Sequence, residues 1–133
     1  MDIDVRQMKS LALAYMGDAV YEMFIREYLL KKGQIKPHHL HQEAITFVSG
    51  KAQAKVILQW LEEKVLTDEE ERIVARGRNA KSASVPKHIS VQTYRYSTAF
   101  ETLLGYLYLD EQKDRLQELM ERAVQFIEEE KSE

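Results

Sequence analysis

The sequence predicts an all-α protein that folds as one compact domain over residues 1–133. Apolar residues recur at three- and four-residue spacing along most of the chain, which is the period of a helix face. No segment shows a convincing two-residue alternation of the kind found in strands. With 133 residues, 44% of them hydrophobic and 31% charged, the chain has the size and composition of one globular domain.

Several classes of protein are excluded by what the sequence lacks. It has no cysteine, so it cannot form a disulfide framework or a thiolate site. It has no run of about 20 apolar residues that would span a membrane. The first residues, MDIDVRQM, do not have the basic and then apolar plan of a secretory signal. These absences favour a cytoplasmic protein.

The first long helix is predicted over residues 11–33, with Ser10 as a candidate N-cap. It ends with two lysines and Gly33, as helices commonly do. One predicted face carries four apolar residues, Leu11, Tyr15, Ile25 and Leu29. The same stripe passes through Asp18 and Glu22. We therefore expect a carboxylate at a position where a core residue would usually lie.

The remaining helices are predicted from their start signals and their apolar spacing. Pro37 opens a helix that runs to residue 48. Ser49 is predicted to cap a helix over residues 51–63, in which Trp60 is a core residue. Thr67 and Glu70 match a capping box at the start of the next helix, which ends near residues 76–78. Residues 79–91 have no helical period and are predicted to form a loop, and helices follow over residues 93–109 and 116–127.

Two glycines inside helices predict where those helices cross. Gly17 precedes Asp18, and Gly105 lies one turn after Glu101. A glycine inside a helix costs roughly 1 kcal/mol relative to alanine, but its missing Cβ lets two backbones approach closely. A crossing at these glycines would bring the carboxylates of Asp18 and Glu101 together. Two carboxylates with no basic residue nearby in sequence favour a hard divalent cation, Mg²⁺ or alternatively Mn²⁺.

A structural explanation of Asp18 remains open beside the metal site. Its carboxylate would then hydrogen-bond a buried arginine or tyrosine, or lie at the solvated margin of the apolar stripe. A single acid on a helix usually has such a role. The second acid near a second helix glycine favours the metal site.

The positive charges of the chain are concentrated in residues 72–100, although the net charge is −3. This segment has no Asp or Glu and has six cations, Arg72, Arg76, Arg78, Lys81, Lys87 and Arg95, so the rest of the chain carries −9. Such segregation predicts contacts with phosphates, whereas a merely solvated helix face usually mixes both signs. We expect four of these cations to contact phosphates, Arg78, Lys81, Lys87 and Arg95. Three polar residues are candidates for sugar or backbone contacts, Asn79, Gln92 and Thr93.

Two segments resemble the ribonuclease III family. LALAYMGDAVYE, around Asp18, is similar to the signature helix of that family, and AFETLLGYLYLD, around Glu101, is similar to its second acidic helix. With GRNAKS at residues 77–82 and QTYRYSTAFE at residues 92–101, the chain looks most like the Mini-ribonuclease III subfamily. The similarity covers nearly the full length.

The resemblance implies an all-helical fold of the ribonuclease III catalytic-domain type and a specific chemistry. Asp18 and Glu101 would hold Mg²⁺ and hydrolyse phosphodiesters in double-stranded RNA. It also implies a homodimer in which each subunit cuts one strand. The subfamily is associated with maturation of large-subunit (23S) ribosomal RNA precursors in bacteria. No double-stranded-RNA-binding domain is expected in residues 1–133, so specificity would come from the nuclease domain or from a helper such as a ribosomal protein.

The sequence departs from the larger family in its acidic residues. The family has acids where this chain has Leu11, Ala14 and Thr98. Because fewer carboxylates are present, we expect one protein-held ion rather than a two-metal clamp. Glu22 has two open interpretations, in which it orients a metal-bound water or pairs with Arg26.

Three functional hypotheses follow in order of preference. The first is a metal-dependent endonuclease for duplex RNA. The second is a non-catalytic module that binds double-stranded RNA with the same fold, and the missing family acids support it. The third is a helical interaction protein without an RNA role, for which binding would not depend steeply on salt.

Overall fold

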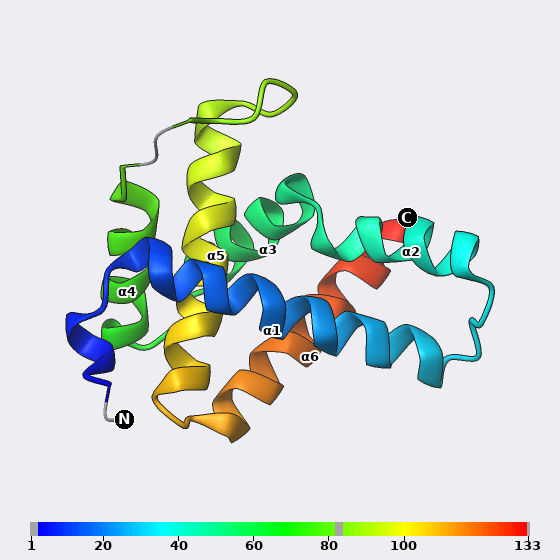
Figure 1. The fold of residues 1–133 in the computed structure, drawn as a ribbon, viewed down its shortest axis with the longest axis horizontal. Helices are drawn as coiled ribbons and strands as arrows, with labels where there is room; N and C mark the ends of the chain where they lie inside the picture. The colour runs from blue at the N-terminus through cyan, green and yellow to red at the C-terminus, as the bar shows by residue number, and fades with distance from the viewer. Residues whose placement is uncertain (1–2, 82–83, 133) are drawn as a thin grey trace.

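The described residues, 3–81 and 84–132 of this computed structural model, form α-helices and one short 3-10 turn and contain no strand (Figure 1). The elements are η1 (Val5–Gln7), α1 (Ser10–Lys31), α2 (Pro37–Val48), α3 (Gly50–Glu62), α4 (Asp68–Asn79), α5 (Val91–Leu109) and α6 (Lys113–Lys131). The all-α prediction is therefore confirmed.

Most of the predicted helix starts are present. Ser49 is the N-cap of α3, and its hydroxyl accepts a hydrogen bond from the Ala52 N–H at 3.2 Å. Both bonds of the Thr67–Glu70 capping box are formed at the start of α4, at 2.9 and 3.1 Å. The predicted cap at Ser10 was wrong, because Ser10 is already helical and Lys9 stands at the cap position.

Helix α5 is the centre of the fold. Every residue from 97 to 107 is buried except Glu101, which is half-buried. Four helices, α1, α3, α4 and α6, pack on it, and Figure 1 shows α1 running across the front of α5. Because these helices pack around α5, it is buried on several sides. Tyr108, near the C-terminal end of α5, is 38% exposed.

The buried face of α1 is rotated from the one that the sequence predicted. Leu11 is 41% exposed and Tyr15 is 83% exposed, so both predicted core positions were wrong. The N-terminal half of α1 instead buries Leu13, Gly17 and Tyr21. The reason is that Gly17 faces α5, and this contact sets the rotation of the helix.

The C-terminal half of α1 agrees better with the prediction. Ile25 and Leu29 are buried, and α2 packs against α1. Asp18 was expected within the core stripe, but its side chain is exposed at the margin of the buried face. The acid is therefore open to solvent and to an approaching ligand.

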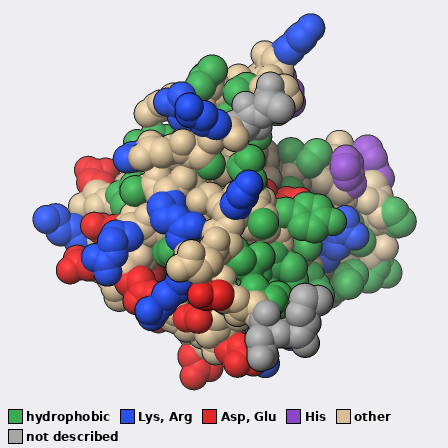
Figure 2. Space-filling model, turned by 60° about the vertical axis from the view of Figure 1, so that its left-hand side comes forward, with side chains coloured by type: hydrophobic (Ala, Val, Ile, Leu, Met, Phe, Trp, Pro, Cys, Tyr) green, Lys and Arg blue, Asp and Glu red, His purple; other side chains and the backbone are tan. Residues whose placement is uncertain are grey.

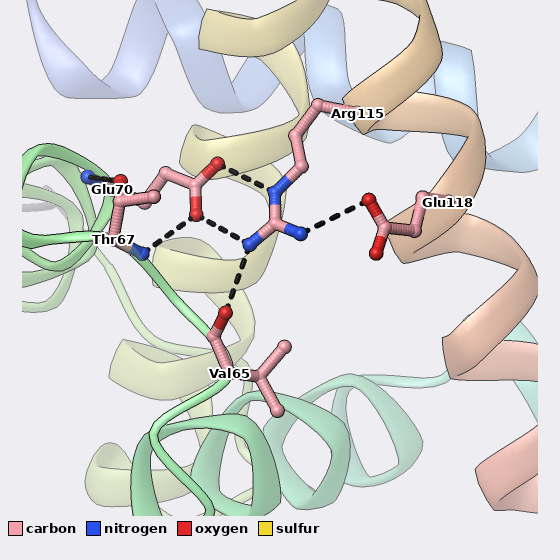
Figure 3. A network of polar contacts seen from close by, with 5 residues as sticks. All are labelled: Val65, Thr67, Glu70, Arg115 and Glu118. Carbon is pink, nitrogen blue, oxygen red and sulfur yellow. Dashed lines mark hydrogen bonds and ion pairs between the residues drawn. The ribbon is translucent and has the colours of Figure 1, made fainter.

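A buried ion pair joins α6 to the start of α4 (Figure 3). Arg115 donates to the two carboxylate oxygens of Glu70 at 2.9 and 2.8 Å and to the Val65 carbonyl at 2.9 Å. Its third contact is Glu118, at 3.1 Å. Burial alone would raise the pKa of Glu70, but the hydrogen bonds from Arg115 and Thr67 outweigh it and hold that pKa below its usual value. Glu70 is therefore a charged structural group.

Candidate active site

Helices α1 and α5 cross at the two predicted glycines. A Cβ atom placed on Gly17 would lie 1.8 Å from the backbone oxygen of Glu101. A Cβ atom placed on Gly105 would lie 1.8 Å from the backbone oxygen of Leu13. Both separations are far below van der Waals contact, so any side chain at either position would force the helices apart. The crossing predicted from the sequence is present.

The crossing brings the carboxylate of Asp18 close enough to that of Glu101 to raise the pKa of Glu101. Burial raises the pKa of Glu101 to about 8, and the hydrogen bond and negative charge of Asp18 contribute to the same shift. Among the described residues, neither carboxylate forms an ion pair with a lysine or arginine. The pair is therefore short of positive charge, which a cation would supply.

The donor set fits a hard divalent cation that keeps most of its water. Mg²⁺ is typically held in proteins by one or two carboxylates together with several water molecules. Asp18 is exposed, which leaves room for water and substrate on its side. Within residues 3–81 and 84–132, no group of three or more His, Cys, Asp and Glu side chains lies close enough together to form a larger metal cage.

Glu22, the next acidic residue of α1 after Asp18, is engaged in an ion pair. Glu22 lies one turn after Asp18, and its carboxylate contacts Arg26 at 3.2 Å. Of the two open interpretations of Glu22, the ion pair with Arg26 is the one that is present in the structure.

Thr98, on α5, stands where the larger family has an acid. Its hydroxyl donates to the Tyr94 carbonyl at 3.0 Å within α5.

Two buried polar residues behind Glu101 were not identified as site residues from the sequence. Gln53, in the first turn of α3, is only 2% exposed, and its side chain acts against the rise in the pKa of the Glu101 carboxyl group. Its amide oxygen accepts from the Ser97 hydroxyl at 2.8 Å. The signal in the sequence was a glutamine between Ala52 and Ala54, but α3 also has Gln59, and composition alone does not tell which of the two is buried.

The residues predicted to bind RNA lie at the end of α4, in the following connection and at the start of α5. Figure 2 shows lysine and arginine side chains over the upper part of this face, toward the α4–α5 connection. Lys81, Lys87 and Arg95 are exposed. Arg78 is half-buried, and its Nε donates to the Asn79 side chain at 3.3 Å.

One boundary of this segment differs from the sequence prediction. Asn79 is the last residue of α4, so the connection begins at Ala80. Thr93 takes part in the cap of α5, where its N–H donates to the Ser90 hydroxyl at 3.0 Å. Ser82, from the GRNAKS motif, lies outside the described residues.

Arg76 belongs to the basic segment but has a structural role. Its guanidinium donates to the carbonyl oxygens of Met8 and Arg6, at 2.7 and 3.4 Å. These bonds hold the segment before α1 against α4. Arg76 is therefore less available for phosphate contacts than Lys81 or Lys87.

Comparison with known proteins agrees with this geometry. The ribonuclease III domain matches residues 11–112, a span that contains Asp18, Glu101 and both crossing glycines. The chain belongs to the ribonuclease III family. Membership in the ribonuclease III family confirms the resemblance seen in the sequence and makes the protein an endoribonuclease.

Within the ribonuclease III family, several relatives match the chain over nearly its whole length. Mini-ribonuclease 3 of Streptococcus pneumoniae is 50% identical, and the match covers 95% of this chain and 98% of that protein. The Enterococcus faecalis protein of the same name is 49% identical, with 93% and 94% covered. The Staphylococcus aureus protein is 41% identical, with 96% of each covered.

A solved structure supports the ribonuclease III fold. The crystal structure of a Fusobacterium nucleatum protein superposes with a TM-score of 0.81 at 27% identity, covering 93% of this chain and 98% of that one.

None of the helices in the described part of the chain is both long and apolar enough to cross a membrane.

Proposed function

We propose that this protein is a metal-dependent endonuclease that hydrolyses phosphodiester bonds in double-stranded RNA. Asp18 and Glu101 are its catalytic residues and its metal ligands, and Mg²⁺ or Mn²⁺ is its cofactor. The observation that carries the proposal is the convergence of these two carboxylates where Gly17 and Gly105 bring α1 and α5 together. Residues 1–133 form the single catalytic domain.

The two carboxylates have different environments and different tasks. When bound, Mg²⁺ polarises a phosphoryl oxygen and lowers the pKa of an attacking water. Half-buried Glu101 holds its ligand position from inside the fold, and exposed Asp18 holds the solvent side, where the phosphate approaches. Because the pKa of Glu101 is raised to about 8, its carboxyl group would have to lose a proton to hold a metal ion at neutral pH.

The duplex is bound through its backbone by the basic segment. A-form RNA is recognised mainly by its shape and by contacts to phosphates and 2′-hydroxyls. Four cations contact phosphates in this proposal, Arg78, Lys81, Lys87 and Arg95. Asn79 contributes a polar contact at the end of α4. Figure 2 shows lysine and arginine side chains over the upper part of the face, toward the α4–α5 connection, which supports the assignment.

The active form is a homodimer in which each subunit cuts one strand. Tyr15 is 83% exposed and Leu11 is 41% exposed, and both lie on α1 within two turns of Asp18. Large apolar side chains left in water favour a contact that covers them. A second copy of this chain is the partner that we assign to these exposed side chains.

The substrate, partner and location are assigned from the resemblance to the Mini-ribonuclease III subfamily. We assign precursors of large-subunit (23S) ribosomal RNA as the substrate, in the cytoplasm. The specificity for the cut position comes from the nuclease domain or from a ribosomal-protein helper. A second candidate, a non-catalytic module that binds double-stranded RNA, is favoured by the residues that replace family acids, Leu11, Ala14 and Thr98.

Cleavage of a defined RNA duplex tests the proposal and separates the two candidates. The parent protein is expected to cut with Mg²⁺ and not with EDTA. Asp18→Asn and Glu101→Gln should each slow cutting by about 10²–10³-fold while duplex affinity changes little. Glu22→Gln is the matched control, because this acid pairs with Arg26 and should not be needed.

Two outcomes would contradict the proposal. If Asp18→Asn cuts as fast as the parent, the site has been misplaced. If the parent binds the duplex but cuts with neither Mg²⁺ nor Mn²⁺, the protein is the non-catalytic module.

A further inference from the structure

Gln53 is a buried amide with two hydrogen bonds inside the fold. It is 2% exposed, and a buried amide without partners would cost several kcal/mol in free energy of folding. Its Oε1 accepts from the Ser97 hydroxyl at 2.8 Å, and its Nε2 donates to the Val48 carbonyl at 3.3 Å. The second N–H of Nε2 is not used by these two bonds. Glu101 follows Ser97 by one turn of α5, and the Gln53 side chain lies near enough to lower the pKa of its carboxyl group.

The partners of Gln53 fix which end of the amide faces Glu101. The Val48 carbonyl can only accept a hydrogen bond, so it must face Nε2 rather than Oε1. The Ser97 hydroxyl then donates to Oε1. The amide therefore presents an N–H, and not an oxygen, to the Glu101 carboxylate.

Packing sets the position of Gln53 relative to α5. A Cβ placed on Gly50, at the start of α3, would lie 2.6 Å from Ile89 Cδ1 and 3.5 Å from the Ser97 hydroxyl oxygen. The first turn of α3 therefore lies close to α5 at Ser97, one turn before Glu101. Ser97 is itself buried. The donor that faces Glu101 is thus held between two packed helices.

We propose that Gln53 is a positioning residue that donates a hydrogen bond to the Glu101 carboxylate and orients it toward Asp18 and the metal ion. Ser97 acts one step further away by holding the amide of Gln53. This inference rests on the proposed metal site. Groups that hydrogen-bond a ligating carboxylate orient it, and their loss typically weakens metal binding about 10–100-fold.

Mn²⁺ binding to the metal-free full-length protein tests this role without a cleavage assay. The signal of free aqueous Mn²⁺ in electron paramagnetic resonance gives the dissociation constant. Gln53→Met keeps the length of the side chain but removes its donors, and it should weaken Mn²⁺ binding about 10–100-fold. Ser97→Ala leaves the amide in place but removes its anchor, and it should have a smaller effect of the same sign.

A matched control separates positioning from loss of stability. Val56 is fully buried in α3 and takes no part in this hydrogen-bond network. Val56→Ala should lower the melting temperature, as Gln53→Met does, while its Mn²⁺ affinity stays within about twofold of the parent value. A fall in affinity as large as that of Gln53→Met would make the effect one of stability and overturn the proposal.

The remaining outcomes each decide the question. A folded Gln53→Met protein with the Mn²⁺ affinity of the parent overturns the role of Gln53. If Gln53→Met does not fold, Ser97→Ala decides, and unchanged affinity there overturns it. If the parent binds no Mn²⁺, or Asp18→Asn binds it as tightly, the proposed metal site itself fails and the role of Gln53 fails with it.

Discussion

The backbone oxygen of Glu101 lies 1.8 Å from the point that a Cβ atom of Gly17 would occupy. The helix contact and the candidate metal site are therefore one structure, because the residue that carries a ligand also supplies the backbone atom at the crossing. Asp18 follows Gly17 directly and is placed by the same contact. A change that separates the two helices should weaken both the fold and the site.

Gly17→Ala should destabilise the fold and weaken metal binding together. The added methyl group cannot fit against the Glu101 backbone, so α1 and α5 must move apart. Overpacking of a close contact typically costs 1–3 kcal/mol, and the backbone atoms here leave little room for relief, so we expect a loss of about 3 kcal/mol. Urea unfolding followed by circular dichroism measures the loss, and Mn²⁺ titration measures the binding.

Gly33→Ala provides a comparison at a different kind of glycine. Gly33 has a positive φ of 98°, and a Cβ added there would meet nothing within 4 Å. Its substitution should cost about 1 kcal/mol through backbone strain and leave metal binding unchanged. If Gly17→Ala costs no more than Gly33→Ala, the close crossing does not exist in solution.

The stability of the metal-free protein should fall as the pH rises from about 4.5 to about 8. Burial and the neighbouring Asp18 raise the pKa of Glu101 from 4.5 to about 8. Between these values the folded protein holds a proton that the unfolded chain has lost, so the free energy of unfolding decreases with pH. Thermal unfolding in EDTA at a series of pH values measures this slope.

Glu101→Gln should remove that part of the pH dependence. The variant is expected to match the parent near pH 4.5 and to be more stable than the parent near pH 8, in EDTA. Added Mg²⁺ should stabilise the parent more at pH 8 than at pH 6, since the ion binds the ionised carboxylate. Equal pH slopes for the parent and Glu101→Gln would contradict the raised pKa of Glu101.

The candidate site could be predicted from the sequence because glycines and acids are informative wherever they interrupt a helix. Gly17 and Gly105 have no local reason to be in helices, so a close crossing was the simplest explanation. The rotation of α1 was not predictable in the same way. Leu11 and Tyr15 have the spacing of a core stripe, and only the contact of Gly17 with α5 shows that they face outward.

The role of Gln53 was also hidden from the sequence, for a related reason. A glutamine is compatible with an exposed helix face, and nothing local distinguishes a buried one. Its partners Ser97 and Glu101 lie more than 40 residues away in the chain. By contrast, the caps at Ser49 and Thr67 use residues within three positions, and both were predicted correctly.

Arg115→Met should cost about 3 kcal/mol of stability, because it leaves the Glu70 carboxylate buried without its partner. Glu70 is 4% exposed, and removing one member of a buried ion pair is strongly destabilising. The double variant Glu70→Met with Arg115→Met should be more stable than Arg115→Met alone, since no unpaired charge remains. Urea unfolding of the parent and the variants measures the coupling between the two residues.

Arg26→Met is the exposed counterpart of this experiment. The Arg26 and Glu22 side chains are 71% and 33% exposed, and their pair should contribute less than about 1 kcal/mol. If the loss of Arg115 costs no more than the loss of Arg26, the pair in Figure 3 does not tie α6 to α4.

Removing cations from the α4–α5 connection should weaken binding of an RNA duplex and reduce its salt dependence. Lys81→Ala combined with Lys87→Ala should lower the slope of log affinity against log salt by one to two, about one for each phosphate that is no longer neutralised. The measurement uses Asp18→Asn protein as the background, so that the duplex is not cut. Fluorescence anisotropy at several salt concentrations gives the slope.

Lys113→Ala combined with Lys131→Ala is the charge-matched control. These lysines are exposed near the two ends of α6, away from the α4–α5 connection (Figure 1). Their loss changes the net charge by the same amount but should leave the salt slope within error of the parent. Equal slopes for the two double variants would mean that net charge, and not the basic segment, controls the affinity.

Tyr15→Glu should convert the proposed homodimer into a monomer and lower cleavage. Tyr15 is 83% exposed on α1, three residues before Asp18, so a charge there would be buried against the second subunit at a high desolvation cost. Sedimentation velocity gives the mass of each species.

Ile35→Glu is the control, because Ile35 is also strongly exposed, at 76%, but follows the far end of α1. A Tyr15→Glu protein that stays dimeric would place the subunit contact elsewhere. A parent protein that is already monomeric and cuts both strands would remove the need for a dimer, because one copy of the Asp18–Glu101 site would then serve both strands in turn.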